Sequence, residues 1–171
     1  MAEYTKEVPR GSFLRFAAWC AYLSGIVSAF GILFLLAFFG GVGGQFGTLN
    51  DVAVIIQYLL MLPIAFALWQ SFRGQAEGLN LSSLLIGLAG MITVIVLQSM
   101  LVSNQITFGS YITIVSIGFL VATAWFVITG VLGRREGKQW PSAMGLDILA
   151  GLYFGYPFWA FKLGKWLMAR A

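Results

Sequence analysis

Long apolar stretches alternate with short polar ones along the whole chain. Between Arg15 and Arg73 the only charged residue is Asp51, and the 56 residues from Gly78 to Gly133 contain no Asp, Glu, Lys or Arg. A single membrane crossing takes about 20 predominantly apolar residues. Each of these two stretches is therefore too long for one crossing and suits two transmembrane helices.

The polar breaks in the pattern place the helix ends. Residues 40–47, GGVGGQFG, hold five glycines, which disfavour helix. The stretches RGQAEGLN at 73–80 and SNQITFGS at 103–110 are polar and mark two further turns. The pattern predicts a polytopic transmembrane helical bundle of the all-α class, forming one integral membrane domain over residues 1–171. Its five helices are expected at about 13–39, 52–72, 81–102, 111–132 and 142–164.

The final apolar segment can be placed in two ways. Leu146 to Leu163 is 18 residues, about 27 Å as a helix, which is close to the roughly 30 Å hydrocarbon core of a bilayer. Residues 148–161 contain no charge, whereas a helix lying in the interface needs a strongly polar face. We therefore expect this segment to cross the membrane and to leave Lys165 to Ala171 on the far side. The alternative is four crossings followed by a surface-lying or re-entrant C-terminal helix.

The composition is that of a membrane protein. Hydrophobic residues make up 60% of the chain and charged residues 9%, against about 25% charged residues in soluble domains. The net charge of +4 could suggest nucleic acid as a partner. The basic residues, however, lie beside apolar spans and form no long run, so we expect the lipid bilayer as the partner and no nucleic acid.

Lysine and arginine in short loops set the orientation of a membrane protein. With the N-terminus in the cytoplasm, the two outer loops contain no basic residue and the inner segments contain seven. These seven are Lys6, Arg10, Arg15, Arg73, Arg134, Arg135 and Lys138. A crossing final segment places the three basic residues of the tail outside, whereas a surface-lying segment keeps all ten on one side. We predict a multi-pass protein whose N-terminus is cytoplasmic.

The chain lacks the residues on which most catalytic and metal sites depend. It contains no histidine and a single cysteine, which excludes His-ligated haem, a histidine general base, a CxxC redox pair and an iron–sulfur cluster. The predicted spans hold no carboxylate pair, no Schiff-base lysine and no chain of ionisable groups. We therefore predict no catalytic residue, no metal site and no cofactor, and a protein that is not an enzyme.

Uncharged polar residues within the predicted spans are the remaining candidates for function. Gln57 and Gln98 stand out because a primary amide in lipid requires a hydrogen-bond partner, and Thr93 and Ser116 belong to the same group. Two interpretations stay open. The amides either pair with neighbouring helices inside the bundle, or they line a cavity for a ligand or pore that a helix kink at Pro63 helps to shape.

Small residues spaced four apart recur on the predicted helices and let backbones approach closely. The pairs are Ser24 and Ser28, Ser83 and Gly87, and Gly151 and Gly155. They either pack helices within the bundle or form an interface with other membrane subunits or a second copy of the chain.

The ending GYPFWAFKLGKWL resembles the ends of small bacterial multi-span proteins that are grouped only as families of unknown function. This resemblance covers the C-terminal stretch alone and implies a location in the bacterial inner (cytoplasmic) membrane, without implying an activity. From the residues we hypothesise a non-catalytic structural or accessory subunit of a larger membrane assembly. The alternative is a binder or transporter of a small or lipophilic molecule with an intramembrane cavity.

Overall fold

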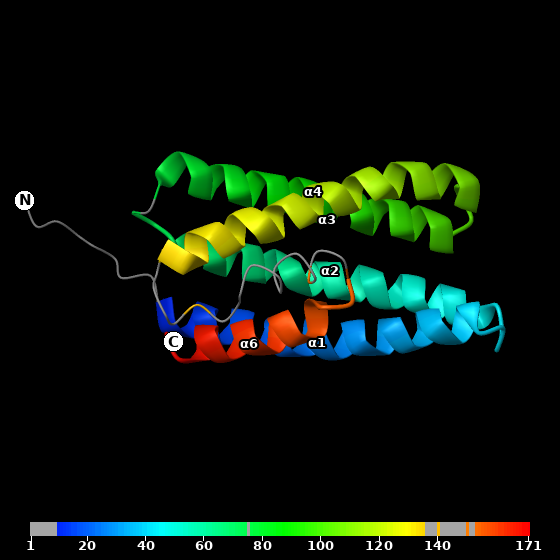
Figure 1. Ribbon diagram of the computed structural model, residues 1–171, viewed down its shortest axis with the longest axis horizontal. Helices are drawn as coiled ribbons and strands as arrows, with labels where there is room; N and C mark the ends of the chain where they lie inside the picture. Colours follow the sequence, from blue (N-terminus) through cyan, green and yellow to red (C-terminus); the bar gives the residue numbers. More distant parts are fainter. Residues whose placement is uncertain (1–9, 75, 136–139, 141–149, 151–152) are drawn as a thin grey trace, which may run out of the picture.

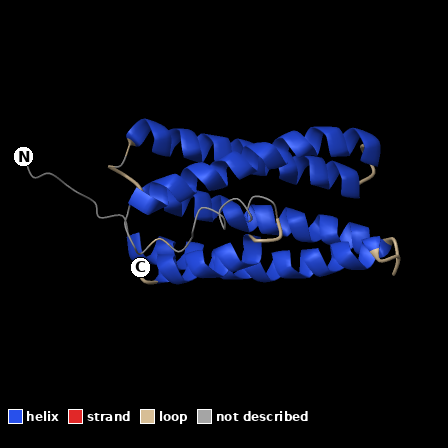
Figure 2. Cartoon of the chain, viewed as in Figure 1, coloured by secondary structure: helices blue, strands red, loops and turns tan. Residues whose placement is uncertain are grey.

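A computed structural model describes residues 10–74, 76–135, 140, 150 and 153–171. The described residues form helices and connecting loops only, as Figure 2 shows. The helices are α1 (Arg10–Phe39), α2 (Gln45–Ser71), α3 (Glu77–Val102), α4 (Phe108–Arg135) and α6 (Tyr156–Met168). The predicted all-α bundle of five helices is therefore confirmed for the described part of the chain.

The first four helices are long and apolar enough to cross a bilayer. They contain 26 to 30 residues each, about 39–45 Å at 1.5 Å per residue, against a hydrocarbon core of roughly 30 Å. Their ends can therefore project into the headgroup regions on both sides. The chain is a multi-pass integral membrane protein.

Most of the spans extend beyond their predicted bounds. The helix expected from residue 52 begins at Gln45, so the glycine-rich stretch is a loop only in its first half. Gly47 lies inside α2, and a Cβ atom there would come within 3.2 Å of the Phe38 ring. The lack of a side chain therefore allows α1 and α2 to approach closely at this point. The helices α3 and α4 also begin before residues 81 and 111, and α2 continues through Pro63.

The helices are arranged around α2, which lies between two helix pairs (Figure 1). It packs against α1 on one side and α3 on the other, while α4 packs along α3 and α6 packs along α1. This central position buries apolar side chains around much of α2, including Met61, Ile64 and Leu68. The outward faces of α1, α3 and α4 carry exposed large hydrophobic side chains, as contact with lipid requires.

The short helix α6 runs back along the first half of α1. The carbonyl of Pro157 and the Cβ of Ala160 lie over Gly25, and the Tyr22 ring lies over Gly164. At the end of the chain, Ala171 lies beside Gly11. The C-terminus is therefore at the end of the bundle where α1 begins (Figure 1).

The predicted crossing of residues 146–163 is wrong. The last helix begins at Tyr156 and contains 13 residues, about 20 Å, which is too short to cross the hydrocarbon core. It also returns to the end where α1 starts, so Lys165 to Ala171 does not lie on the far side. The alternative of four spans and a re-entrant C-terminal helix describes the structure. Residues 142–149, which the prediction had placed in the same helix, lie outside the described residues.

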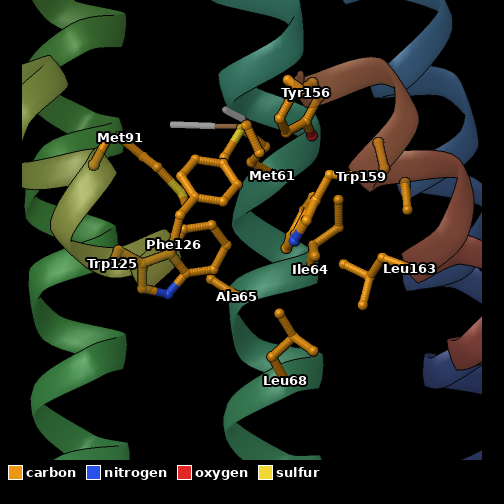
Figure 3. Close-up of a cluster of buried hydrophobic side chains, with 14 of the residues drawn as sticks. Met61, Ile64, Ala65, Leu68, Met91, Trp125, Phe126, Tyr156, Trp159 and Leu163 are labelled. Carbon is orange, nitrogen blue, oxygen red and sulfur yellow. The ribbon is translucent and has the colours of Figure 1, made fainter. Parts of the chain in front are cut away.

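An aromatic cluster packs α6 against α4. Trp159 and Tyr156 of α6 contact Trp125 and Phe126 of α4, and all four side chains are almost fully buried (Figure 3). The rings of Phe126 and Trp159 are edge to face, with centroids 4.9 Å apart and an interplanar angle of 81°. Such pairs contribute about 0.5–1.5 kcal/mol beyond the burial of their area.

The small residues predicted at packing faces lie inside the bundle where they are described. Gly87 lies directly beneath the Trp125 ring, at the contact between α3 and α4. Ser24, Ser28, Ser83 and Gly155 are buried as well, and Gly151 lies outside the described residues. The described positions therefore support packing within the bundle.

Replacing Trp159 by Ala should lower the thermal stability of the protein strongly. Truncating a buried Phe or Trp to Ala costs about 3–5 kcal/mol, and Trp159 is 0% exposed. Its neighbour Phe158 is 69% exposed, so Phe158→Ala is a matched control that should change stability little. Thermal unfolding of both variants in mild detergent measures the difference. Equal losses in the two variants would contradict the placement of α6.

Candidate functional site

A polar cluster around Asp51 lies at the end of the bundle opposite the C-terminus. Asp51 is near the start of α2, Gln98 is near the end of α3, and Tyr111 is near the start of α4. Because neighbouring spans run in opposite directions, these three positions share one level of the bundle. The cluster therefore draws on three different helices.

Gln98 is bound at both ends of its amide group. Its Nε2 donates a hydrogen bond to Asp51 Oδ1 at 2.5 Å, and the Tyr111 hydroxyl donates to its Oε1. The Gln98 side chain is only 1% exposed. One amide thus connects α2, α3 and α4, as the bundle interpretation of this residue predicts.

A second branch of the cluster leads toward α6. The Asn50 side chain hydrogen-bonds to Asp51, and the Tyr153 hydroxyl donates to Asn50 Oδ1 at 3.2 Å. Tyr153 stands three residues before α6 and has a left-handed backbone conformation, with φ at +75°. The Asp51 cluster therefore consists of Asn50, Asp51, Gln98, Tyr111 and Tyr153 and includes the re-entrant tail.

The Asp51 carboxylate interacts with hydrogen-bond donors and polar neighbours, away from the basic residues. Every Lys and Arg in the described part of the chain lies toward the opposite end of the bundle. Asp51 is half-buried, and its charge lies within electrostatic range of Tyr111 and Tyr153. Charge-assisted hydrogen bonds of this kind are stronger than neutral ones. The carboxylate therefore holds the side chains of Asn50 and Gln98 in place.

A smaller polar group lies near the other end of the bundle. The hydroxyls of Ser83 and Thr129 are 3.3 Å apart, and Asn80 Nδ2 donates to the Trp69 carbonyl at 2.9 Å. These four residues, with Trp125, help to line a cavity of about 10 Å³. That volume suffices for about one water molecule, and neither Gln57 nor Gln98 lines it.

The four polar residues that the sequence singled out lie in different surroundings. Gln98 belongs to the Asp51 cluster, whereas Gln57 is buried on α2 and its Oε1 has no hydrogen-bond partner among the described residues. Thr93 packs its methyl group toward Gly118. Ser116 is exposed and donates to the Ile112 carbonyl of its own helix. These residues do not form one shared site.

Sequence reasoning missed Asp51 as the centre of the cluster. The available signal was that Asp51 is the only charge between Arg15 and Arg73, because an ionisable residue within a span is functional or paired by default. Tyr111 and Tyr153 carried no such signal. Tyrosine is common near helix ends in membrane proteins, where it lies at the membrane–water interface, so its position alone does not indicate a polar cluster.

Comparison of the chain with known protein families, curated proteins and solved structures gives no match. Within the described residues, no group of three or more Cys, Asp or Glu side chains could hold a metal ion.

Replacing Gln98 by Leu should destabilise the bundle by about 1–2 kcal/mol. Interhelical hydrogen bonds in membrane proteins average about 0.6 kcal/mol with a maximum near 1.7, and this variant removes two of them while leaving Asp51 without one donor. Ser116→Ala is the control, since this hydroxyl bonds only within its own helix. Unfolding in detergent measures both variants. A Gln98→Leu protein as stable as the parent would contradict the role of the amide as a connector.

Proposed function

We propose that this protein is a non-catalytic subunit with a structural or accessory role in a larger membrane assembly. The observation that carries the proposal is the pairing of Gln98, the best-connected polar side chain of the interior. Both ends of its amide are bound to residues of the same bundle. A side chain engaged in this way supports the helix arrangement and leaves no free group to act on a substrate.

The outer surface is where such a subunit would meet its partners. Leu85 on α3 and Ile117 and Leu120 on α4 are exposed, large and apolar. Such faces suit either lipid or another transmembrane helix. The loops at residues 40–44 and 103–107 are short and uncharged and offer little to a partner in solution, which favours partners within the membrane.

The orientation we propose places the basic end of the bundle in the cytoplasm and the Asp51 cluster toward the outside of an inner membrane. With α6 re-entrant, the described basic residues fall toward the end where α1 begins. This bias agrees with the rule that short cytoplasmic segments are rich in Lys and Arg. Arg73 stacks on Trp69 at 4.4 Å and Arg170 on Trp166 at 4.0 Å, and such pairs suit the membrane interface.

A binder or transporter of a small molecule is the second candidate. It is favoured by Gln57, whose buried Oε1 has no partner in the described structure, and by the short helix that begins inside the bundle. Transporters often bind substrates where helices are interrupted near the middle of the membrane. The cavity beside Asn80, Ser83 and Thr129 has room for about one water molecule. It is too small for a substrate, which favours the subunit role.

Native mass spectrometry of the tagged protein, expressed at its natural level and extracted in mild detergent, tests the proposal. We expect the 18.7 kDa chain in a complex of fixed stoichiometry with at least one other membrane protein. A harsher detergent should release the single chain, which serves as the control for specific assembly. A chain that carries a stoichiometric small molecule and no second protein would contradict the proposal and favour the transporter.

A further inference from the structure

Two buried polar side chains, one on α1 and one on α2, lie at one level of the contact between these helices. The two helices are antiparallel, and their register is fixed by Gly47 against Phe38 and by Gly31 against Ala53. Ser28 lies about one turn before Gly31 on α1, and Gln57 lies about one turn after Ala53 on α2. Because the helices are antiparallel, both steps lead toward the end of the bundle where α1 begins. The two side chains therefore lie at the same level of the interface.

Neither of these side chains has a partner for its oxygen atom. Ser28 is 0% exposed and Gln57 is 2% exposed, and Ser28 Oγ and Gln57 Oε1 have no hydrogen bond in the described structure. An unsatisfied polar group within the membrane costs several kcal/mol. Two such atoms on facing helices at the same level are best explained by a shared partner.

The start of the re-entrant segment closes this position from a third side. The Tyr153 hydroxyl lies against Gly31, one turn from Ser28 in one direction. The Tyr156 hydroxyl is 2.8 Å from Ser24 Oγ, one turn away in the other direction. Ser28 is thus bracketed by two tyrosine hydroxyls, next to the point where α6 begins.

We infer that Ser28 and Gln57 hold an ordered water molecule at the tip of the re-entrant helix. The water donates one hydrogen bond to Gln57 Oε1 and exchanges another with the Ser28 hydroxyl. A buried water typically makes about three hydrogen bonds, and the Tyr153 and Tyr156 hydroxyls lie about one turn of α1 away on either side. This inference goes beyond the proposed subunit role and does not depend on it.

The chemistry of the position favours a neutral molecule. A cation would be repelled by the positive end of the α6 dipole. The carboxylate of Asp51 lies six positions earlier on α2, about 9 Å along the helix, and is too far away to bind such a cation directly. An anion would be repelled by the carbonyl oxygen of Gln57. Water is the small molecule that both donates and accepts hydrogen bonds and is always present.

This water would extend the polar contacts of the Asp51 cluster into the middle of the bundle. Asn50 and Tyr153 lead from Asp51 toward Gly31, and the pair of Tyr156 and Ser24 continues on the other side of the water. The non-helical residues 153–155, just before α6, then lie beside hydrated polar groups. Irregular backbone at membrane depth is tolerated where it is buried in protein or lines water.

Radiolytic labelling in ¹⁸O-enriched water tests the site with a matched pair of reporters. Tyr156 and Trp159 lie three residues apart on α6 and are both 0% exposed, so bulk solvent reaches neither. We expect Tyr156 to take up ¹⁸O several-fold faster than Trp159, because a bound water lies one turn away. Ser28→Ala combined with Gln57→Leu should bring the uptake at Tyr156 down to that at Trp159.

Thermal unfolding supplies a second, independent outcome. If a water bridges the two side chains, Ser28→Ala and Gln57→Leu should each lower the melting temperature by about 2–4 °C, and the double variant should lose less than the sum. If the position is dry, Gln57→Leu removes an unsatisfied group and should raise the melting temperature. Equal ¹⁸O uptake at Tyr156 and Trp159, or a higher melting temperature for Gln57→Leu, would overturn the inference.

Discussion

The contact between Trp159 of α6 and the Trp125–Phe126 pair of α4 decides how the last part of this chain can lie in a membrane. A helix of 13 residues is too short to cross the hydrocarbon core, and its first turn leaves backbone N–H groups without helical partners. Such a segment is stable at membrane depth only if protein covers its irregular backbone. The aromatic cluster and the contact of α6 along α1 bury one face of the helix, while its other face carries exposed apolar side chains such as Phe158.

The polar interior depends on the same placement of the tail. Tyr153, just before α6, hydrogen-bonds to Asn50 of the Asp51 cluster, and Tyr156 bonds to Ser24 on α1. The tail therefore supplies hydroxyl groups at two levels of the bundle, while α3 and α4 supply Gln98 and Tyr111 at the first of these levels. If α6 were displaced, polar groups on α1 and α2 would lose their partners as well as their packing.

The four spans could be predicted from the sequence because each is an apolar run long enough to cross the membrane alone. The fate of the last segment could not be predicted from length and hydropathy, which treat residues 146–163 as one unit. The interruption was visible in Gly155 and Pro157, and the left-handed conformation of Tyr153 shows that the chain turns there. The basic residues of the tail had pointed to the correct side, since a re-entrant helix keeps them with the other basic residues.

The polar candidates were predictable in kind and less so in their partners. That Gln98 needs a partner in the bundle follows from the cost of an unpaired amide. That the partner is Asp51 follows only once the start of α2 is known to lie at residue 45 and at the level of the end of α3. Gln57 gave the same sequence signal as Gln98, but its Oε1 has no hydrogen-bond partner in the described structure. The difference depends on which side chains of the neighbouring helices lie opposite each amide, and the sequence of one helix does not reveal them.

The most direct test of the re-entrant tail is the side of the membrane on which the C-terminus lies. Reporter fusions to the C-terminus, green fluorescent protein in one set of cells and alkaline phosphatase in another, can be compared with a protease-cleavable tag at the N-terminus. The structure predicts that both ends of the chain lie on one side, with a fluorescent and phosphatase-negative C-terminus if that side is the cytoplasm. An N-terminus and a C-terminus on opposite sides would contradict the placement of α6 and the account of the polar interior built on it.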